Sequence, residues 1–307
     1  MILRIGTRGS RLALAQSGWV KAQLEARHPD VEVTLVRIKT TGDNILDAPL
    51  SKVGGKGLFV KEIEEALLRE QVDLAVHSMK DVPADLPEGL EIGVFPERED
   101  PRDAFVSERY ERLKDLPRGA AVGTSSLRRA AQLLRERPDL KVVPLRGNVD
   151  TRIRKMKQEG LGALILAAAG MKRMGLSLMI RYPIPLREML PAIGQGALGL
   201  EIRRGDKRVI ERIDFLNHEG TALTVRAERA FLRELQGGCQ VPIAGHARLD
   251  GDHLFLEGLV AELDGKGMIR DVLTGRKDGP EALGIGLAKR VLAAGADRIL
   301  AHVYARV

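Results

Sequence analysis

Hydroxyl and arginine side chains are gathered in residues 123–129, which read Gly-Thr-Ser-Ser-Leu-Arg-Arg. A short apolar run precedes them and an amphipathic run follows, so Thr124, Ser125 and Ser126 stand where a strand passes into a helix. The backbone N–H groups of a first helical turn, hydroxyl groups and guanidinium groups all favour an anion. The segment therefore predicts an anion site, although a capped helix with solvated arginines has the same pattern, and that interpretation stays open.

A carboxylate follows a predicted strand in residues 77–83, which read His-Ser-Met-Lys-Asp-Val-Pro. The carboxyl end of a strand is where open α/β sheets bind ligands. In a cationic cleft Asp81 would stay ionised and would stabilise a developing cation or move a proton, whereas elsewhere it would only cap the turn before Pro83. His77 has no second histidine at metal-ligand spacing, so we expect a buried, hydrogen-bonded strand residue and no metal site.

Cys239 is the single cysteine of the chain and lies in residues 237–242, Gly-Gly-Cys-Gln-Val-Pro. A single cysteine excludes an internal disulfide, a zinc ribbon and a redox pair. Its glycine neighbours leave the thiol open and nearby positive charge favours the thiolate, although a lone cysteine is also a common small buried hydrophobe. No histidine beside it supplies a papain-like pair, so covalent hydrolysis is a poor fit.

Glycines and lysines are combined in residues 51–57, Ser-Lys-Val-Gly-Gly-Lys-Gly, between a predicted strand and a predicted helix. Glycines let backbone N–H groups approach an anion closely, and Lys52 and Lys56 add positive charge. The Gly-Lys-Ser/Thr ending of a Walker A loop is missing, so the segment does not predict a nucleotide site of that kind. It indicates either a second anion contact or an ordinary surface loop.

The whole chain is basic: its 307 residues include 49 Lys plus Arg and 42 Asp plus Glu, a formal net charge of +7. Only 3% of residues are aromatic, which leaves little for base stacking, and no nucleic-acid partner is expected. The arginines occur in short separate groups, a pattern that suits a small anion bound in a cleft. Arginines interrupt the apolar N-terminal residues and no stretch reaches the roughly 18 apolar residues of a membrane span, so we expect a cytoplasmic protein without a membrane partner.

The elements that position these segments alternate between short β-rich runs and amphipathic helices, the pattern of βαβ units and parallel sheets. A first series is predicted at 2–6, 10–27, 31–38, 59–69 and 73–77, and a second at 121–124, 127–137, 142–145, 149–158 and 163–168. Charged and proline-rich residues 96–101 between the two series predict a hinge. After about Glu219 a long helix, three antiparallel strands and a last helix over 280–294 predict a small α+β domain.

These segments, in this order, resemble the porphobilinogen deaminases, also called hydroxymethylbilane synthases, of tetrapyrrole biosynthesis. Further blocks that match the family are residues 7–10, 52–62, 98–104, 145–148, 194–196 and 228–243. The resemblance spans essentially the whole chain, and chance agreement of so many separate blocks is negligible.

The resemblance implies a transferase that deaminates four porphobilinogen molecules and condenses them head to tail into hydroxymethylbilane, with release of ammonia. It also implies a covalent dipyrromethane cofactor, joined by a thioether to Cys239, and Asp81 as the catalytic carboxylate. Each pyrrole ring bears an acetate and a propionate, which explains many arginines, because guanidinium groups bind carboxylates in a bidentate manner. The implied cofactor- and substrate-binding residues are Arg8, Ser10, Lys52, Lys56, Lys80, Thr124, Ser125, Ser126, Arg128, Arg129, Arg146, Gly147, Asn148, Arg152, Arg173 and Gln195.

The resemblance further implies an α/β fold of two periplasmic-binding-protein-like lobes, with mixed, mostly parallel sheets, and a small C-terminal α+β domain. The implied divisions are 1–96 with 197–215, 97–196, and 219–307, the last carrying Cys239 into the cleft. The loop over 47–57 is expected to close over the site, and the protein is expected to be a monomer.

Two interpretations from other classes are an anion-binding protein without catalysis and an RNA-binding protein. The lack of a signal peptide in the sequence counts against the first, and the scarcity of aromatic residues counts against the second.

Overall fold

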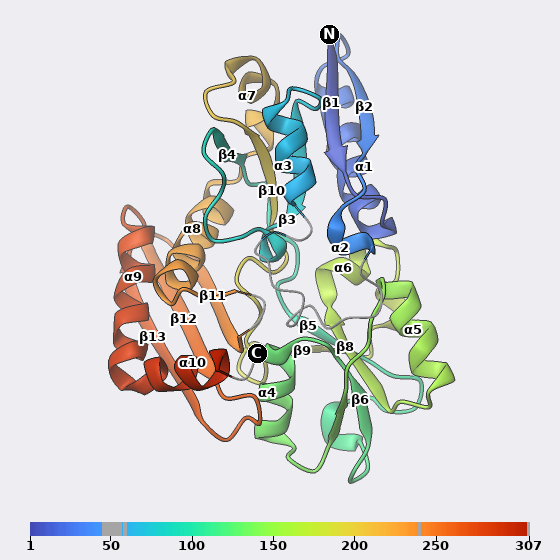
Figure 1. The fold of residues 1–307 in the computed structure, drawn as a ribbon, viewed down its shortest axis with the longest axis vertical. Helices are drawn as coiled ribbons and strands as arrows, with labels where there is room; N and C mark the ends of the chain where they lie inside the picture. Colours follow the sequence, from blue (N-terminus) through green and yellow to red (C-terminus); the bar gives the residue numbers. More distant parts are fainter. Residues whose placement is uncertain (45–56, 58–59, 239–240, 306–307) are drawn as a thin grey trace.

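The computed structural model describes residues 1–44, 57, 60–238 and 241–305, and its strands form three separate sheets (Figure 1). Lys52, Lys56 and Cys239 lie outside these ranges, and so does the closing loop expected over 47–57, apart from Gly57. In the part of the chain that is described, no helix is long and apolar enough to cross a membrane.

The first sheet has the strand order β2-β1-β3-β10-β4. Its strands are β1 (Ile2–Thr7), β2 (Glu32–Arg37), β3 (Leu74–Ser78), β4 (Leu90–Val94) and β10 (Leu198–Arg203). β1 pairs in parallel with β2 and β3, and β10 enters antiparallel between β3 and β4, so all strands except β10 run in one direction. Together with the helices α1 (Arg11–Arg27), α2 (Thr41–Asn44), α3 (Lys61–Leu68) and α7 (Lys207–Ile213), we call this sheet lobe 1.

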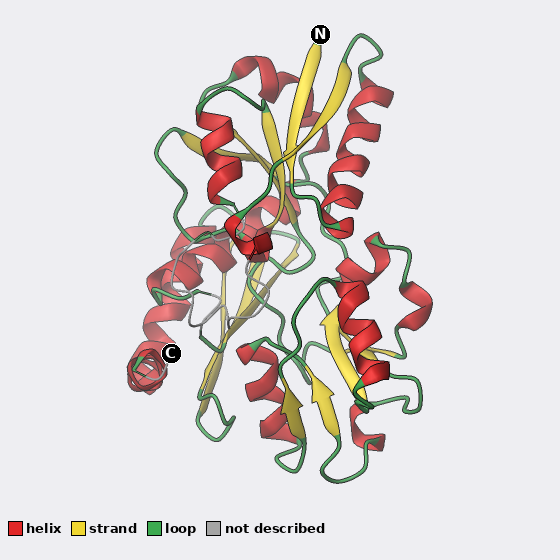
Figure 2. Ribbon diagram, turned by 45° about the vertical axis from the view of Figure 1, so that its right-hand side comes forward, coloured by secondary structure: helices red, strands yellow, loops and turns green. Residues whose placement is uncertain are grey.

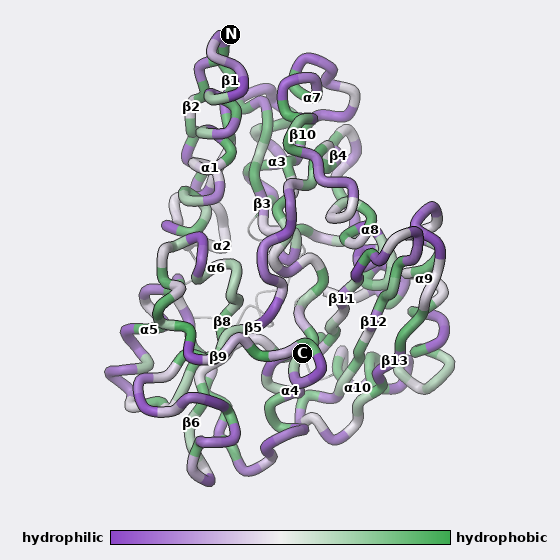
Figure 3. Tube along the Cα trace, turned by 180° about the vertical axis from the view of Figure 1, so that it is seen from behind, coloured by the Kyte–Doolittle hydropathy of each residue, from purple (hydrophilic) through white to green (hydrophobic). Residues whose placement is uncertain are grey.

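The central strand of lobe 1 is held from both faces, because successive side chains of a strand point to opposite sides. Leu74 and Val76 of β3 enter a core that includes Val20 of α1, whereas Ala75 enters a second core with Leu67 of α3. In Figure 3 hydrophobic stretches follow the strands, and the outer turns are hydrophilic. The residues that follow β3 are thereby fixed near the middle of the molecule (Figure 1).

The second sheet repeats this plan, with the strand order β7-β6-β8-β5-β9. Its strands are β5 (Asp103–Val106), β6 (Ala121–Gly123), β7 (Lys141–Val143), β8 (Ala163–Ala167) and β9 (Tyr182–Ile184). β6 pairs in parallel with β7 and β8, and β5 lies antiparallel between β8 and β9. With the helices α4 (Leu127–Glu136), α5 (Val149–Gln158) and α6 (Ala168–Arg173), this sheet forms lobe 2.

The third sheet is an antiparallel meander of β11 (Ile243–Asp250), β12 (His253–Ala261) and β13 (Met268–Arg276). The helices α8 (Glu219–Glu234), α9 (Pro280–Val291) and α10 (Asp297–Tyr304) pack on it, and we call this unit the third domain. The two longer helices meet closely: a Cβ at Gly284 of α9 would lie 2.3 Å from the Ala227 carbonyl oxygen of α8. Phe231, fully buried, fills the space between α8 and the sheet.

The fold class expected from the sequence is confirmed: two α/β lobes with mixed sheets in which most strands are parallel, and a small α+β domain. The helix predicted over 149–158 matches α5, and Ser10 caps α1 as predicted. The sequence analysis missed β4, β5, β9 and β10, and also the helices α2, α6, α7 and α10. The domain boundaries stay a prediction.

Candidate active site

Two segments connect the lobes: crossing 1 (residues 95–102) leads from β4 to β5, and crossing 2 (residues 185–197) leads from β9 to β10. The Glu99 amide donates a hydrogen bond to the Gly196 carbonyl (3.2 Å). Gly196 has a φ of +88°, and a Cβ there would lie 2.3 Å from the Glu99 carbonyl oxygen, so the contact requires glycine. Figure 2 shows the segments between the two sheets, and the elements that could form a site meet around them.

The hydroxyl residues of lobe 2 hold the turn from β6 into α4. Ser126 is the N-cap of α4, and its hydroxyl accepts a hydrogen bond from the Arg129 amide (3.4 Å). Thr124 Oγ1 accepts from the Ser126 amide (3.2 Å), and Ser125 Oγ donates to the Leu145 carbonyl. All three hydroxyls therefore position the start of α4, as the capping interpretation of this segment predicts.

The two arginines of that turn are buried, so the interpretation with solvated arginines is wrong. Arg128 is 5% exposed and Arg129 is 6% exposed. Arg128 Nη1 donates to Asp103 Oδ2 (2.7 Å), and Arg129 Nη2 donates to Asp103 Oδ1 (2.7 Å). Burial opposes ionisation of Asp103, yet the charges of Arg128 and Arg129 hold its pKa far below its ordinary range. We call Asp103, Arg128 and Arg129 the lobe 2 ion cluster.

The equivalent junction of lobe 1, from β1 into α1, lies against lobe 2. Ser10 caps α1 by accepting a hydrogen bond from a first-turn amide (3.3 Å), and Arg8 just before it is partly buried. Arg11 reaches across to lobe 2, where Nη1 donates to Asp150 Oδ1 (2.9 Å) and Nη2 donates to the Met174 carbonyl (3.0 Å). The junctions of both lobes therefore border the same space.

A carboxylate of lobe 1 faces the arginines of lobe 2. A 3₁₀ turn (Met79–Asp81) follows β3. Burial lowers the pKa of Lys80 to about 8; Asp81 and Asp103 oppose this shift, and the two arginines of the lobe 2 ion cluster add to it. The Asp81 carboxylate is exposed, and none of the described residues forms an ion pair or a hydrogen bond with it. The turn thus carries a carboxylate that remains available to a ligand.

A second turn of lobe 2 adds cations to the same space. Arg146, Gly147 and the N-cap residue Asn148 lead from β7 into α5, and Arg152 Nε donates to the Gly147 carbonyl (2.8 Å). Burial, followed by the positive charges of Arg129 and Arg146, lowers the pKa of Arg152 to about 10, while Asp81 acts in the opposite direction. Arg152 therefore lies within electrostatic reach of both the ion cluster and the lobe 1 carboxylate.

Comparison with known families decides to which family the chain belongs. Residues 3–211 match the family model described as porphobilinogen deaminase, dipyrromethane cofactor binding domain, and residues 222–293 match the model of its C-terminal domain. The chain belongs to the porphobilinogen deaminase family. The family, the enzyme class and the dipyrromethane cofactor expected from the sequence are thereby confirmed.

Similar proteins over the full length bear the same family name. A porphobilinogen deaminase of Geobacter sulfurreducens is 58% identical over 304 residues, which cover 99% of this chain and 95% of the relative. A porphobilinogen deaminase of Pelobacter propionicus is 59% identical and covers 99% of this chain and 98% of the relative. Among solved structures, the methionine binding protein MetQ has 14% identity and a TM-score of 0.42, over 69% of this chain and 87% of that one.

The donor set of this porphobilinogen deaminase fits a ligand that carries several carboxylates. Arg173 of α6 adds another guanidinium group to those of lobe 2, and burial lowers its pKa to about 10. Arg173 Nη2 donates to the Gly196 carbonyl (2.7 Å) of crossing 2. Gln195 beside it is buried, and no described residue donates to its Oε1. An unpaired buried acceptor next to many cationic donors suits a ligand with both N–H groups and carboxylates, as a chain of pyrrole rings has.

The third domain supports the lobe 1 turn from behind. Arg229 of α8 donates from Nη1 to the Val82 carbonyl (3.2 Å) and from Nη2 to the Pro83 carbonyl (2.7 Å). Val225 of the same helix packs with Met79 and Val82. The Asp81 turn is therefore fixed between β3 and α8.

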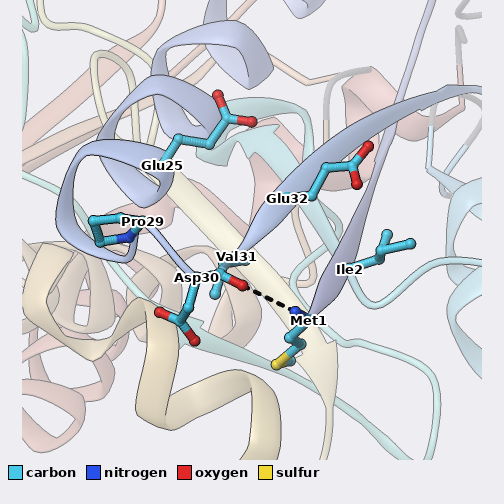
Figure 4. Close-up of a pocket in the computed structure, with 7 residues that line it drawn as sticks. All are labelled: Met1, Ile2, Glu25, Pro29, Asp30, Val31 and Glu32. Carbon is cyan, nitrogen blue, oxygen red and sulfur yellow. Dashed lines mark hydrogen bonds between the residues drawn. The ribbon is translucent and has the colours of Figure 1, made fainter.

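The pocket drawn in Figure 4 lies away from these site residues, at the N-terminal end of lobe 1. Glu25, Asp30 and Glu32 line it, and the Met1 amine donates to the Asp30 carbonyl (2.9 Å). Its carboxylates would repel a carboxylate ligand, so it is not part of the porphobilinogen deaminase site. No group of His, Cys, Asp or Glu side chains in the described residues is arranged to hold a metal ion.

The structure brings many of the predicted site residues together. Lys80, Asp81, Arg128, Arg129, Arg146 and Arg152 share one electrostatic neighbourhood, Thr124, Ser125, Ser126, Gly147 and Asn148 form the turns beneath it, and Arg173 and Gln195 contact the crossings. The sequence analysis missed Asp103, because its partners lie 25 and 26 residues away in the chain. The signal that the sequence did offer was its place in the block 98–104, which matches the family.

Proposed function

We propose that the cleft between the lobes is where this enzyme condenses four porphobilinogen molecules into hydroxymethylbilane, with Asp81 as the catalytic carboxylate. One observation carries the proposal: the exposed Asp81 carboxylate, which has no hydrogen-bond partner among the described residues, lies within electrostatic reach of Arg152 of lobe 2. Its neighbour Lys80 is in turn within electrostatic reach of the buried Arg128 and Arg129. The substrate carries carboxylates and forms a cation during the reaction. The arginines suit its carboxylates, and the Asp81 carboxylate suits the cation.

Arginines hold the rings in line. Arg128 and Arg129 are fixed by burial, and Arg146 and Arg152 lie on the neighbouring turn, so acetate and propionate groups of successive rings meet donors whose positions are set in advance. Holding two reacting rings at contact distance supplies much of the rate of a coupling step. Lys80 contributes a further positive charge below its pKa of about 8.

Asp81 acts on the charge that develops in the substrate. Loss of ammonia from the aminomethyl group leaves a cation conjugated with the pyrrole ring, and an ionised carboxylate nearby lowers the free energy of that cation. The same carboxylate can accept a hydrogen bond from a pyrrole N–H and take up the proton that leaves the ring after coupling. Since none of the described residues pairs with Asp81, its charge is available for these steps.

Dipyrromethane, bound by a thioether to Cys239, would supply the free pyrrole position from which the chain grows. The proposed binding residues are Arg8, Ser10, Lys52, Lys56, Lys80, Thr124, Ser125, Ser126, Arg128, Arg129, Arg146, Gly147, Asn148, Arg152, Arg173 and Gln195, of which Lys52 and Lys56 are assigned by resemblance alone. We also propose domains of 1–96 with 197–215, 97–196 and 219–307, and a monomer in the cytoplasm that binds no nucleic acid.

Intact mass spectrometry tests the proposal. The purified protein should be heavier than its sequence by one dipyrromethane and should give a colour with Ehrlich reagent. Cys239→Ser should lose both signals, because a hydroxyl is a far poorer nucleophile than a thiolate at neutral pH. A parent protein that has no adduct and does not consume porphobilinogen would contradict the function, and an adduct that survives in Cys239→Ser would contradict the attachment site.

A further inference from the structure

Asp103 joins the binding arginines to the connection between the lobes. It is the first residue of β5, directly after crossing 1, and its side chain is fully buried. Besides the two arginines it accepts a hydrogen bond from Gln195 Nε2 (2.9 Å), which comes from crossing 2. The Asp103 carboxylate therefore contacts α4 and crossing 2, and Asp103 itself directly follows crossing 1 in the chain.

Gln195 extends this contact to crossing 1. Its Nε2 also donates to the Pro101 carbonyl (2.8 Å), and its backbone carbonyl accepts from Arg98 Nε (2.9 Å). The arginines have fixed contacts on their other side, since Arg128 Nη1 donates to the Leu190 carbonyl (2.7 Å) of crossing 2. Side chains of α4 and backbone groups of both crossings thus form one continuous hydrogen-bonded unit.

The lobe 2 ion cluster retains positive charge and hydrogen-bond donors for a ligand. Two guanidinium groups and one carboxylate leave one net positive charge. In the described residues Arg128 Nε donates no hydrogen bond, so donors remain for a ligand carboxylate. If Asp103 served only as a neutralising charge, its removal would make the cluster more positive and would strengthen the binding of an anion.

A second buried aspartate shows what such a cluster looks like away from the cleft. Asp73, before β3, is 1% exposed and accepts hydrogen bonds from Arg4 Nε (3.0 Å) and Arg208 Nη2 (2.6 Å), with Arg203 Nη2 at 3.7 Å. Its arginine side chains are partly exposed, 40% for Arg4 and 50% for Arg208, and they connect only elements of lobe 1. Asp73 therefore supplies a control with the same chemistry and no contact with a crossing.

We propose that Asp103 is a positioning residue for carboxylate binding, which holds Arg128 and Arg129 against both crossings through Gln195, so that the arginine pair and the connection between the lobes move as one unit. This inference rests on the proposed function, in which the arginine pair binds carboxylates of the cofactor and substrate. Asp103 does not need to touch either molecule: it acts through the guanidinium groups and through Gln195.

Substitution of Asp103 by Asn tests this role with a side chain of nearly the same size. The new amide group would point a donor at one of two guanidinium donors, so the arginines would lose their fixed positions. We expect the KM for porphobilinogen to rise about tenfold or more with a smaller change in kcat, and a smaller fraction of protein to carry the cofactor by intact mass. Asp73→Asn should lower the Tm while KM and cofactor content stay unchanged.

Three results would overturn the inference. An unchanged or lower KM in Asp103→Asn would leave Asp103 as a neutralising charge, and equal KM changes in Asp103→Asn and Asp73→Asn would point to general destabilisation. In a double-mutant cycle with Gln195→Leu, KM changes that multiply would show independent roles, whereas the inference requires the double variant to resemble the more impaired single variant.

The same assays separate this inference from the proposed function. A parent protein without cofactor and without porphobilinogen consumption would contradict the function, whereas an active parent with an unaffected Asp103→Asn would contradict only the positioning role. Should Asp103→Asn not yield folded protein, Gln195→Leu decides, because it leaves both ion pairs intact. It should raise KM without loss of the arginine contacts, and a KM equal to that of the parent would overturn the link.

Discussion

The junctions from β1 into α1 and from β6 into α4 are equivalent places in the two lobes. Each follows the strand that pairs in parallel with two neighbours, and each helix begins after a serine N-cap whose hydroxyl accepts from a first-turn amide. Neither helix has an acidic residue in its first turn, so both N-terminal ends remain favourable to anions. The same local design is thus presented from two sides of one cleft.

The two junctions differ in how their arginines are held. In lobe 2 Arg128 and Arg129 lie within the first turn and are buried against Asp103. In lobe 1 Arg8 precedes the cap and is partly buried, and Arg11 is largely exposed and pairs with Asp150 of the other lobe. Lobe 2 therefore supplies two buried cations that a carboxylate of the same lobe holds, whereas lobe 1 supplies the more exposed Arg8 and Arg11 together with the carboxylate of Asp81. Under the proposed function, this difference leads us to propose that lobe 2 sets where the rings lie and that lobe 1 acts on their charge.

The largest effect is expected at Asp81, where lobe 1 contributes its charge. Asp81→Asn removes the negative charge with little change in size, so the coupling rate should fall by about two to three orders of magnitude, while folding and cofactor content persist. Asp81→Glu keeps the charge but displaces it, and should retain more activity than Asn. Single-turnover kinetics on cofactor-loaded enzyme measures this, and near-parental coupling by Asp81→Asn would leave a capping role as the better interpretation.

Substitution of one arginine on each side tests the comparison directly. Arg128→Leu leaves the buried Asp103 with one fewer counter-charge, which should cost about 3–5 kcal/mol of unfolding free energy and impair cofactor assembly. Arg8 is only partly buried, so Arg8→Leu should cost less unfolding free energy than Arg128→Leu, and it should leave the cofactor in place but stall chain elongation. Denaturant unfolding and intact mass after incubation with porphobilinogen distinguish the two. Equal losses of stability in both variants would show that the lobes hold their arginines in the same way.

Lys80 makes the lobe 1 side sensitive to pH. Its pKa of about 8 lies below the ordinary value of 10.5, so the cleft loses a positive charge as pH rises through about 8. The KM for porphobilinogen should therefore increase between pH 7 and 9. Lys80→Arg stays charged throughout this range and should show a flatter profile. If the parent and Lys80→Arg had the same pH profile of KM, the assignment of this effect to Lys80 would be wrong.

The same shift has a defined sign for stability. Between about 8 and 10.5 the unfolded chain binds a proton at Lys80 that the folded chain has released. The contribution of Lys80 to the free energy of unfolding therefore becomes more favourable to the folded state as pH rises through this window. Comparison of the parent with Lys80→Gln by denaturant unfolding at pH 7 and pH 10 checks this sign, because the stability advantage of the Gln variant should shrink at the higher pH.

Features fixed by neighbouring residues were predictable from the sequence. The cap at Ser10 follows from a hydroxyl residue beside an amphipathic run, and the helix over 149–158 follows from its apolar spacing; the structure has both where they were predicted. The family resemblance supplied the cofactor and the site residues. None of this required knowledge of which strands are neighbours.

Features that depend on distant pairing could not be predicted in this way. β10 lies between β3 and β4 although more than a hundred residues separate it from both, and β5 is only four residues long at the end of a charged segment. Asp103 could be recognised only as part of a matching block, since its three partners come from α4 and crossing 2. The last helix was missed because the chain continues past a break at Gly295, where φ is 105°.

The smallest effect concerns how α4 is supported from behind. The turn between β12 and β13 packs on α4: a Cβ at Gly265 would lie 2.3 Å from the Ala131 carbonyl oxygen, and Arg135 Nη1 donates to the Lys266 carbonyl (2.9 Å). Gly251, in the turn between β11 and β12, also has a positive φ, but a Cβ there would meet no atom within 4 Å. The two glycines share a positive φ, which would strain any residue with a Cβ, and they differ in how closely another segment approaches.

Gly251→Ala should therefore cost about 1 kcal/mol through its backbone alone. Gly265→Ala should cost more, by about 1–3 kcal/mol, because the turn must move away from α4 as in an overpacked core. Since the first turn of α4 carries Arg128, this displacement should also raise the KM for porphobilinogen by about twofold to threefold, whereas Gly251→Ala should leave KM unchanged. Thermal unfolding and steady-state kinetics measure both quantities. Equal losses in the two variants would mean that the third domain adds no support to the fixed arginines of lobe 2, and that burial against Asp103 alone accounts for the difference between the lobes.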